Sequence, residues 1–173
     1  IIQESLPVLT NVSIGLLSGP GMYVSGFADQ FVAKQPSLSV FLKGNVPFIA
    51  DKLFVKLQGV YMGHSVKKSS TLSGIDVSVA NYAAGFFSGY DGMLFSLFIS
   101  PQVGFGYFYQ SIEMSGFVDE EYTNNFPFAA AALDVTYFIN EHIGIVLSPV
   151  YYFQFQNNNT MLGTISLGMN VRF

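Results

Sequence analysis

The chain has 173 residues, with 7 Lys and Arg against 11 Asp and Glu, so only 10% of its residues are charged, whereas soluble globular domains carry about 25%. The net charge of −4 leaves no basic surface for nucleic acid, and the absence of cysteine excludes disulfides and thiolate chemistry. Although 50% of the residues are hydrophobic, no apolar run reaches the 18 residues of a membrane helix, which excludes a helical membrane protein. One domain spanning 1–173 is expected at this length.

Apolar residues instead recur at every second position, from the start of the chain to its end. The alternation covers eight segments: 6–16, 38–48, 53–61, 75–87, 93–109, 129–137, 143–155 and 161–173. A period of two indicates β-strands with one apolar face. Most of these segments have 11 or more residues, enough for a tilted strand to cross a bilayer. The sequence therefore predicts eight long strands.

The links between these segments alternate in length. The segments 49–52, 88–92 and 139–142 are short and rich in turn formers, whereas 18–37, 65–74 and 110–125 are long. Short turns at one rim and long loops at the other are typical of outer-membrane barrels. The first long link is expected to contain a strand extension around Met22 to Phe31.

Charged residues avoid the apolar phase of every predicted strand. Those within strands lie on the opposite phase, at Lys43, Lys56, Asp76, Asp134 and Arg172. A charged side chain that faces hydrocarbon costs about 2–4 kcal/mol near the bilayer midplane. The apolar face is therefore expected to face lipid, and only closure satisfies every backbone polar group there. The predicted fold is an all-β, closed antiparallel eight-stranded transmembrane up-and-down β-barrel.

Aromatic residues of the apolar phase gather at both ends of the strands. They predict two girdles at the membrane interfaces, made by Phe48, Phe87, Phe95 and Tyr137 near the short turns and by Tyr61, Tyr107, Tyr109, Tyr151, Phe153 and Phe155 near the long links. The alternative is an ordinary aromatic sheet core, because Phe and Tyr favour strands in any case.

The last eight residues, Ser166 to Phe173, carry a motif. With Ser166, Gly168, Val171 and the terminal Phe173, they resemble the C-terminal signal of bacterial outer-membrane barrels, and the strand count is similar to the OmpA membrane domain, OmpX and OmpW types. The resemblance implies insertion by the outer-membrane assembly machinery, contact with the bilayer and lipopolysaccharide, and periplasmic N- and C-termini. Because no signal peptide precedes Ile1, we expect the sequence to be a mature or trimmed form.

Three charged residues are expected to meet inside the barrel. Lys43 and Lys56 face each other around the 49–52 turn with both side chains inward, and two adjacent ammonium groups require an anion. Asp134 lies at a similar height on the opposite wall. The sequence therefore predicts a Lys43, Lys56 and Asp134 cluster that plugs the lumen, or alternatively an ion or anionic-ligand site.

His64 and Asp76 flank the 65–74 link and are expected to face one another near the loop-side mouth, with Ser78 one step deeper. These are the ingredients of a hydrolase, but the spacing favours a hydrogen-bonded cross-strand pair. No enzyme activity and no cofactor are expected. The second histidine, His142, is too distant for a shared metal site, so no metal is expected either.

Two functions remain open. The first is a non-enzymatic outer-membrane barrel, monomeric and with a largely plugged lumen, that acts as an envelope anchor or as a surface-loop adhesion protein for a host or envelope partner. The second is a narrow conduit or pocket for a small apolar molecule, with a lateral exit at Pro101 or Pro149, where each proline removes a ladder hydrogen bond. The second is suggested by predicted inward aromatic residues: Phe41, Phe54, Tyr82, Phe86, Phe98, Phe108 and Tyr152.

Overall fold

The computed structural model describes residues 9–25, 30–47, 49–66, 76–115, 120–156 and 160–173. Its strands are β1 (Thr10–Gly19), β2 (Gly21–Tyr23), β3 (Phe31–Ala33), β4 (Ser37–Asn45), β5 (Leu53–Val66), β6 (Asp76–Tyr90), β7 (Gly92–Leu94), β8 (Leu97–Ser115), β9 (Glu120–Phe138), β10 (Ile143–Gln154) and β11 (Thr160–Arg172). Across these ranges no helix has the length and hydropathy to span a membrane.

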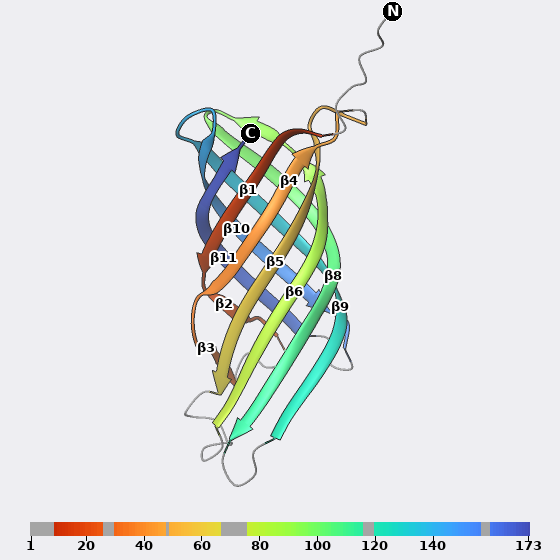
Figure 1. Ribbon diagram of the computed structural model, residues 1–173, viewed down its shortest axis with the longest axis vertical. Helices are drawn as coiled ribbons and strands as arrows, with labels where there is room; N and C mark the ends of the chain where they lie inside the picture. The colour runs from red at the N-terminus through yellow and green to blue at the C-terminus, as the bar shows by residue number, and fades with distance from the viewer. Residues whose placement is uncertain (1–8, 26–29, 48, 67–75, 116–119, 157–159) are drawn as a thin grey trace, which may run out of the picture.

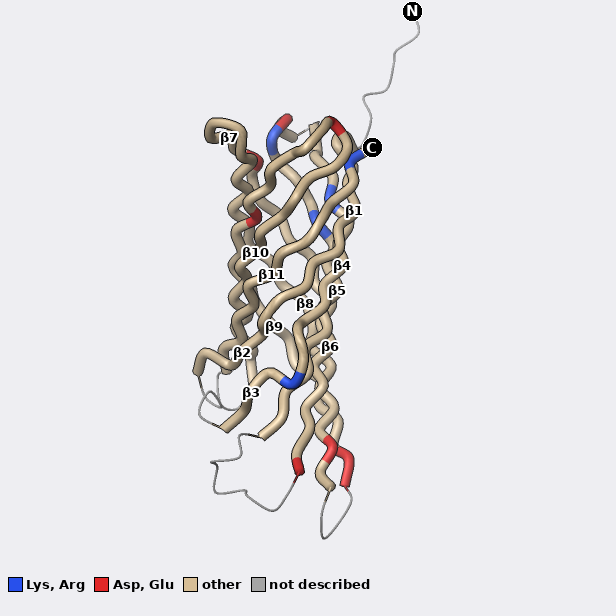
Figure 2. The backbone as a smooth tube through the Cα atoms, turned by 90° about the vertical axis from the view of Figure 1, so that its left-hand side faces the viewer, with Lys and Arg blue, Asp and Glu red and all other residues tan. Residues whose placement is uncertain are grey.

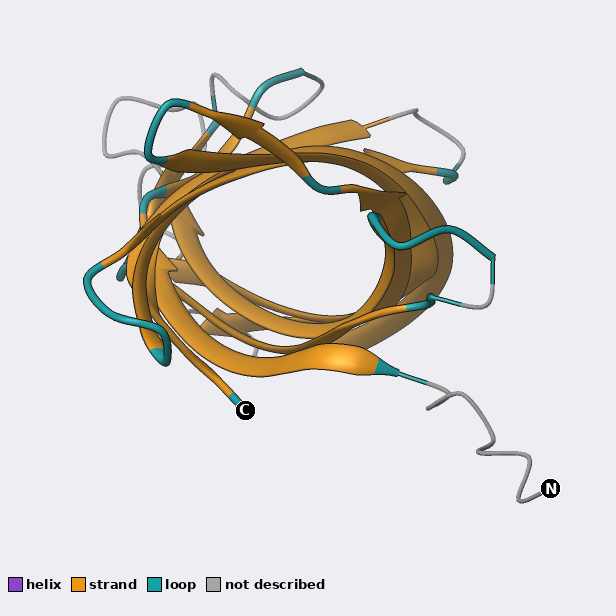
Figure 3. Ribbon diagram, turned by 90° about the horizontal axis from the view of Figure 1, so that it is seen from above, coloured by secondary structure: helices purple, strands orange, loops and turns teal. Residues whose placement is uncertain are grey.

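These strands form one closed antiparallel sheet. The order is β1-β4-β5-β6-β8-β9-β10-β11, and the ring closes where β1 pairs with β11. The short strands extend this ring, since β2 continues along β11, β3 pairs with β5 and β7 pairs with β8. Within the described residues, eight strand positions therefore surround a single lumen. Figure 3 shows the sheet as a closed ring. The predicted eight-stranded barrel is confirmed.

The two rims of the barrel differ in their connections. The terminal rim, where β1 begins and β11 ends, also carries the β4–β5 and β9–β10 turns (Figure 1). At the opposite loop rim, the predicted 110–125 loop is wrong, because β8 continues to Ser115 and β9 starts at Glu120. The expected strand extension in 18–37 is present as β2 and β3. The 65–74 link lies almost entirely outside the described residues.

Most strands face the way the sequence predicts. Outward side chains include Leu16, Val40, Leu57, Val103 and Leu167, all exposed aliphatic residues on the outer wall. The lumen takes the opposite phase of the same strands, as the register and burial of neighbouring residues require. The result is an apolar exterior around a mixed polar and aromatic interior.

The facing predicted for the fourth strand is wrong. In β6, Tyr82 and Phe86 point outward, whereas Asn81 and Phe87 are buried in the lumen. Asp76, predicted inward, is exposed. Both phases of this strand are rich in apolar residues, so hydrophobicity alone does not choose between them. Packing chooses, because the Phe87 ring fills the space above Gly104, where an added Cβ would lie 2.4 Å from that ring.

The predicted 88–92 turn is also wrong. β6 runs to Tyr90, and after Asp91 the chain forms an additional hairpin in which β7 pairs with the start of β8, with Leu94 opposite Leu97. Its two-residue turn, Phe95-Ser96, contains neither Gly nor Asn, so the sequence gives no turn signal there. Phe95 accordingly adopts a positive φ of 55°.

Side chains fill much of the lumen. The larger apolar cluster extends from the Phe87 ring beside Lys56 toward the loop rim and includes Phe108, Phe126, Phe128 and Tyr152. The Phe108 ring packs edge-on against the Phe128 and Tyr152 rings, with centroids 5.0 and 5.5 Å away. A smaller apolar cluster of Leu17, Phe41 and Val146 lies apart from it. The candidate site residues lie on both sides of this aromatic layer, some toward the terminal rim and some toward the loop rim.

Candidate functional site

A buried ion pair crosses the lumen, nearer the terminal rim than the loop rim. Lys56 Nζ of β5 lies 2.8 Å from Asp134 Oδ2 of β9, and the side chains are only 0% and 4% exposed. Ser148 of β10 donates its hydroxyl to Asp134 Oδ1 at 2.6 Å. The Lys56 ammonium also lies between two rings, 5.1 Å from the centroid of Phe41 and 5.4 Å from that of Phe87. Opposite charge, hydrogen bonding and aromatic faces together compensate for the lost hydration.

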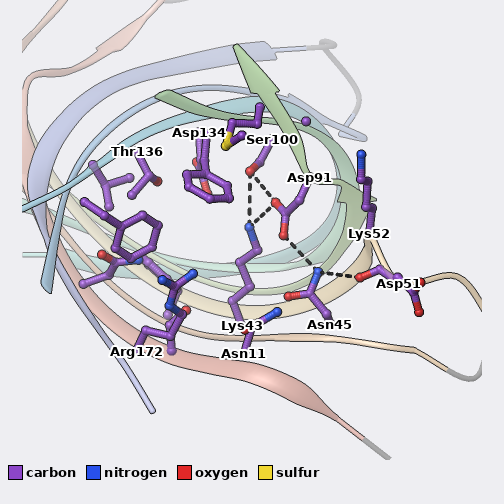
Figure 4. Close-up of a pocket in the computed structure, with 18 residues that line it drawn as sticks. Asn11, Lys43, Asn45, Asp51, Lys52, Asp91, Ser100, Asp134, Thr136 and Arg172 are labelled. Carbon is purple, nitrogen blue, oxygen red and sulfur yellow. Dashed lines mark hydrogen bonds and ion pairs between the residues drawn. The ribbon is translucent and has the colours of Figure 1, made fainter. Parts of the chain in front are cut away.

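The third member of the predicted cluster has a different partner, so the prediction that Lys43 joins Asp134 is wrong. Lys43 and Lys56 do pair across β4 and β5, but Lys43 Nζ lies 2.5 Å from Asp91 Oδ1, nearer the terminal rim. Asp91 also accepts hydrogen bonds from Ser100 Oγ at 2.5 Å and from Asn45 Nδ2 at 3.0 Å (Figure 4). Each lysine therefore has its own carboxylate.

Sequence reasoning missed Asp91 because it was assigned to a turn. The signal was available in the charge count, since Asp134 alone cannot neutralise two inward lysines. We call Lys43, Asp91, Ser100 and Asn45 the rim cluster. Across the described ranges, its Lys43–Asp91 pair and the Lys56–Asp134 pair are the two ion pairs.

A cavity of about 270 Å³ opens beside the rim cluster. Lys43, Asp91, Thr136 and Arg172 lie around it (Figure 4), and Phe98 also lines it. The Arg172 guanidinium lies 4.0 Å from the centroid of the Phe138 ring, and its Nε donates to Glu141 O at 3.1 Å. The cavity occupies the terminal-rim end of the lumen, and the buried Lys56 and the aromatic layer lie between it and the loop rim.

Nearer the loop rim, His64 lies in a buried polar network, and the predicted His64, Asp76 and Ser78 constellation is wrong. His64 is paired with Val79 across β5 and β6. Its ring Nδ1 lies 3.3 Å from Asn81 Nδ2, and its Nε2 lies 3.2 Å from Gly21 O. These contacts fit a neutral ring that accepts from Asn81 and donates to the Gly21 carbonyl.

The rest of this network comes from residues that sequence reasoning missed. Gln110 Nε2 donates to Asn81 Oδ1 at 2.9 Å, and Asn81 Nδ2 lies 3.3 Å from the Tyr23 hydroxyl. Ser78 lies on the opposite face of β6 from Asn81, and its Oγ accepts a hydrogen bond from Lys34 Nζ at 3.3 Å. Asn81 was the available signal, because an amide on the supposed lipid face argues for the opposite facing of that strand.

The predicted girdle residues fall into three groups. The prediction that Phe87 belongs to a girdle is wrong, because its side chain is buried in the lumen. Phe48 lies outside the described residues. The others point outward, with Tyr61 half-buried and the remainder exposed: Phe95, Tyr107, Tyr109, Tyr137, Tyr151, Phe153 and Phe155. In the C-terminal motif, Ser166 faces the lumen, whereas Val171 and Phe173 are exposed on the outer side.

Neither proline shifts the register of the wall. Pro101 pairs with Leu133 and Pro149 pairs with Ile165 in an unshifted register. On its other side, Pro149 lies at a gap in the β9–β10 ladder, between the pairs Leu147–Val135 and Val150–Ala132, and the register is the same on both sides of the gap. The described ranges also contain no group of three His, Cys, Asp or Glu residues placed to hold a metal ion. Chemically, the described part of the lumen offers two ion pairs and a set of buried amides. Several of these amides keep a side-chain atom without a hydrogen-bond partner, namely Gln58, Gln102, Gln154 and Asn170.

Comparisons with known proteins show which solved structures have a similar fold. No family model matches the sequence, and no curated protein is significantly similar to it. Among solved structures, Neisserial surface protein A is 14% identical with a TM-score of 0.70, covering 95% of this chain and 99% of that one. A major outer membrane protein from Thermus thermophilus is 12% identical with a TM-score of 0.69, covering 94% and 99%.

A third structure is Ail, the attachment invasion locus protein of Yersinia pestis, in complex with the heparin analogue sucrose octasulfate. It is 13% identical with a TM-score of 0.60, covering 95% of this chain and 98% of that one. Identities this low speak for the fold alone. The chain has the fold of the small eight-stranded outer-membrane β-barrels.

Proposed function

We propose that this protein is a non-enzymatic integral barrel of the bacterial outer membrane, with a plugged lumen, that anchors and presents its loop rim to a partner outside the cell. The terminal rim would then face the periplasm. Support for the membrane setting comes from the outer wall, where Val103, Phe105 and Tyr107 are each more than 60% exposed. A water-soluble protein rarely leaves so large a contiguous apolar face uncovered.

The observation that carries the plugged lumen is the buried Lys56–Asp134 pair. A conducting pore would surround its charged residues with water, but these side chains are essentially inaccessible. The aromatic layer closes the path on the loop-rim side. An eight-stranded barrel is only wide enough to be filled by side chains or to hold one small ligand, so a wide channel is disfavoured on geometric grounds as well.

A role at the cell surface is supported by the lengths of β8 and β9. Each has 19 residues, whereas a transmembrane strand needs about 9–11. The surplus lies at the loop rim, where the paired strands reach the lower end of the molecule in Figure 1. Rigid paired strands above a membrane suit the display of a binding surface.

The charge of this extension indicates the kind of partner. Its described residues include Glu113, Glu120 and Glu121, and Figure 2 marks acidic segments at the ends of these strands. Ail was solved with a polyanion, and an acidic surface would repel such a ligand. We therefore expect a partner with positive charges, and no binding of sucrose octasulfate at this end.

Two other functions receive less support. The hydrolase ingredients are dispersed, because His64 contacts Asn81 and Gly21 instead of a carboxylate and a serine. A conduit with a lateral exit would need the strands beside a proline to separate, but the register is unshifted at Pro101 and at Pro149, including across the gap in the β9–β10 ladder. The 270 Å³ cavity lies at the terminal-rim end and involves one end of the lumen only.

Single-channel recording in planar lipid bilayers tests the plug. We expect the folded wild-type barrel to give no conductance steps above the bilayer leak. The double variant Lys56→Ser with Asp134→Ser removes the buried pair without leaving an unpaired charge. Conductance steps in this variant alone would identify the pair as the group that blocks the lumen. Reproducible unit steps from the wild-type protein would refute the proposal.

A further inference from the structure

We propose that the hairpin of residues 92–99, made by β7, the Phe95-Ser96 turn and the start of β8, is a lipid anchor that inserts into the interface of the periplasmic leaflet. We call it the rim hairpin. The inference rests on the proposed membrane setting and adds a contact surface that the barrel fold does not require. Its ligand is the boundary between phospholipid headgroups and acyl chains.

The exposure of the rim hairpin is the first reason. Met93, Leu94 and Phe95 are three consecutive large apolar residues that are 69%, 53% and 89% exposed. No charged residue occurs between Gly92 and Ile112. The β9–β10 turn at the same rim is different, since it contains Asn140, Glu141 and His142. A tip without charge is poorly suited to water and well suited to a membrane interface.

The depth of the rim hairpin is the second reason. On β8, Tyr109 comes ten positions after Ile99, and at 3.4 Å per residue and a tilt near 40° these ten steps span about 26 Å along the barrel axis. The apolar band of such barrels is about 25 Å tall. Because Tyr109 is the last exposed aromatic residue of β8 in the direction of the loop rim, we place the outer edge of the band there, and the opposite edge falls near Ile99, at the base of the hairpin.

The direction of the rim hairpin is the third reason. Leu94 pairs with Leu97, and Leu97 pairs with Tyr137 of β9, so the outer face of the hairpin continues the lipid-facing wall. In Figure 2 the β7 end projects sideways beyond the barrel wall rather than along the axis. A sideways projection at this depth meets lipid, whereas an axial projection would meet the aqueous periplasm.

The base of the rim hairpin is held rigidly. Asp91, the residue before β7, is fixed by Lys43 and Asn45 of β4 and by Ser100 of β8. Phe98 packs edge-on against Phe138, with ring centroids 5.2 Å apart. The rim cluster thus gains a role, because it joins the base of the hairpin to β4 across the lumen and fixes its angle.

The backbone conformation of the turn also supports the proposal. Two-residue hairpin turns of the I′ and II′ types need positive φ at their first central residue, where glycine, asparagine or aspartate is usual. This chain places Phe95 there with φ 55°. A phenylalanine accepts such a backbone only at an energetic cost, and the cost is understandable if its ring is needed at the tip as an anchor.

The chain contains no tryptophan, so single-tryptophan variants give a direct test. Phe95→Trp, Val103→Trp and Glu141→Trp are folded into vesicles of phosphatidylcholine that carries bromine at a series of known chain depths. Val103 is on the exposed outer wall, and Glu141 is in the polar turn of the same rim. Because Glu141→Trp also introduces an indole at this rim, it controls for the preference of tryptophan itself for interfaces.

We expect the emission of Phe95→Trp to be quenched most by the shallowest bromines, and its quenching by aqueous iodide to be about threefold weaker than that of Glu141→Trp. Val103→Trp should respond to the deeper bromines. If Phe95→Trp is quenched by iodide as strongly as Glu141→Trp while Val103→Trp responds to bromine, the barrel is in the membrane and the anchor is refuted.

The remaining outcomes also decide. Protection of Phe95→Trp from both iodide and bromine would mean that protein covers the tip, a second copy of the chain in this purified system, and would overturn the lipid assignment. Failure of Val103→Trp to respond to any brominated lipid would overturn the membrane setting itself, and with it the proposed function. Folding of each variant is checked by the altered gel mobility of the unheated barrel.

Discussion

The two lysines inside the barrel are in unequal environments. Lys56 and Asp134 are shut away from solvent, whereas the side chains of Lys43 and Asp91 are 15% and 16% exposed. Solvent screens the second pair but hardly reaches the first. Removing one partner of the buried pair leaves an uncompensated charge in the lumen, and the cost of that charge is the energy that a mutation would reveal.

We therefore expect Asp134→Ala to lower the free energy of unfolding by about 3–5 kcal/mol, measured by urea titration of the barrel in lipid vesicles. The double variant Lys56→Met with Asp134→Leu should recover most of this loss, because it removes both charges and keeps the volume filled. Asp91→Ala, at the more exposed pair, should cost clearly less. Equal losses for Asp91→Ala and Asp134→Ala would contradict the burial argument.

Among the strands, β6 separates what the sequence can predict from what it cannot. The register of β4 and β5 follows from a short turn, and the structure has the expected pairing of Lys43 with Lys56. The facing of β6 does not follow, since Val77 and Val79 favour one phase while Tyr82 and Phe86 favour the other. The facing of β6 is determined by packing against side chains on other strands, and the sequence of one strand does not show which side chains these are.

The errors at the candidate sites have the same origin. Once β6 is turned over, His64 loses Asp76 as a partner, Asn81 enters the lumen and Phe87 leaves the predicted girdle. The rim hairpin is missed for a different reason, because its turn has no Gly or Asn and relies on a positive φ at Phe95. Patterns over eight strands thus predicted the barrel, while individual contacts depended on packing.

The facing of β6 makes a prediction about its neighbour β8. A Cβ at Gly104 would lie 2.4 Å from the Phe87 ring, whereas a Cβ at Gly59 would have its nearest contact at 3.7 Å. Gly104→Ala should therefore lower the free energy of unfolding by about 1–3 kcal/mol, and Gly59→Ala should leave it nearly unchanged. Phe87→Leu should offset part of the Gly104→Ala loss in a double-mutant cycle. Additive losses would mean that Phe87 does not occupy the space above Gly104.

At the scale of the whole molecule, the two rims differ in chemistry as well as in shape. The loop rim carries the extended β8 and β9 with Glu113 and Glu121 directly opposite each other. The terminal rim carries short turns, the rim cluster and the end of β11. Under the proposed function, we expect this asymmetry to orient the barrel in an asymmetric membrane, with the acidic extension outside the cell and the chain ends in the periplasm.

The absence of cysteine lets a single introduced thiol report this orientation. We expect Glu121→Cys, which is exposed on the β9 extension, to react with a membrane-impermeant maleimide on intact cells. Glu141→Cys, exposed in the β9–β10 turn, should react only after the outer membrane is permeabilised. Both thiols replace exposed glutamates, so their intrinsic reactivity is comparable and the bilayer is the main difference between them. Labelling of Glu141→Cys on intact cells, with Glu121→Cys protected, would require the inverted orientation, because β9 connects the two positions as one continuous strand across the barrel.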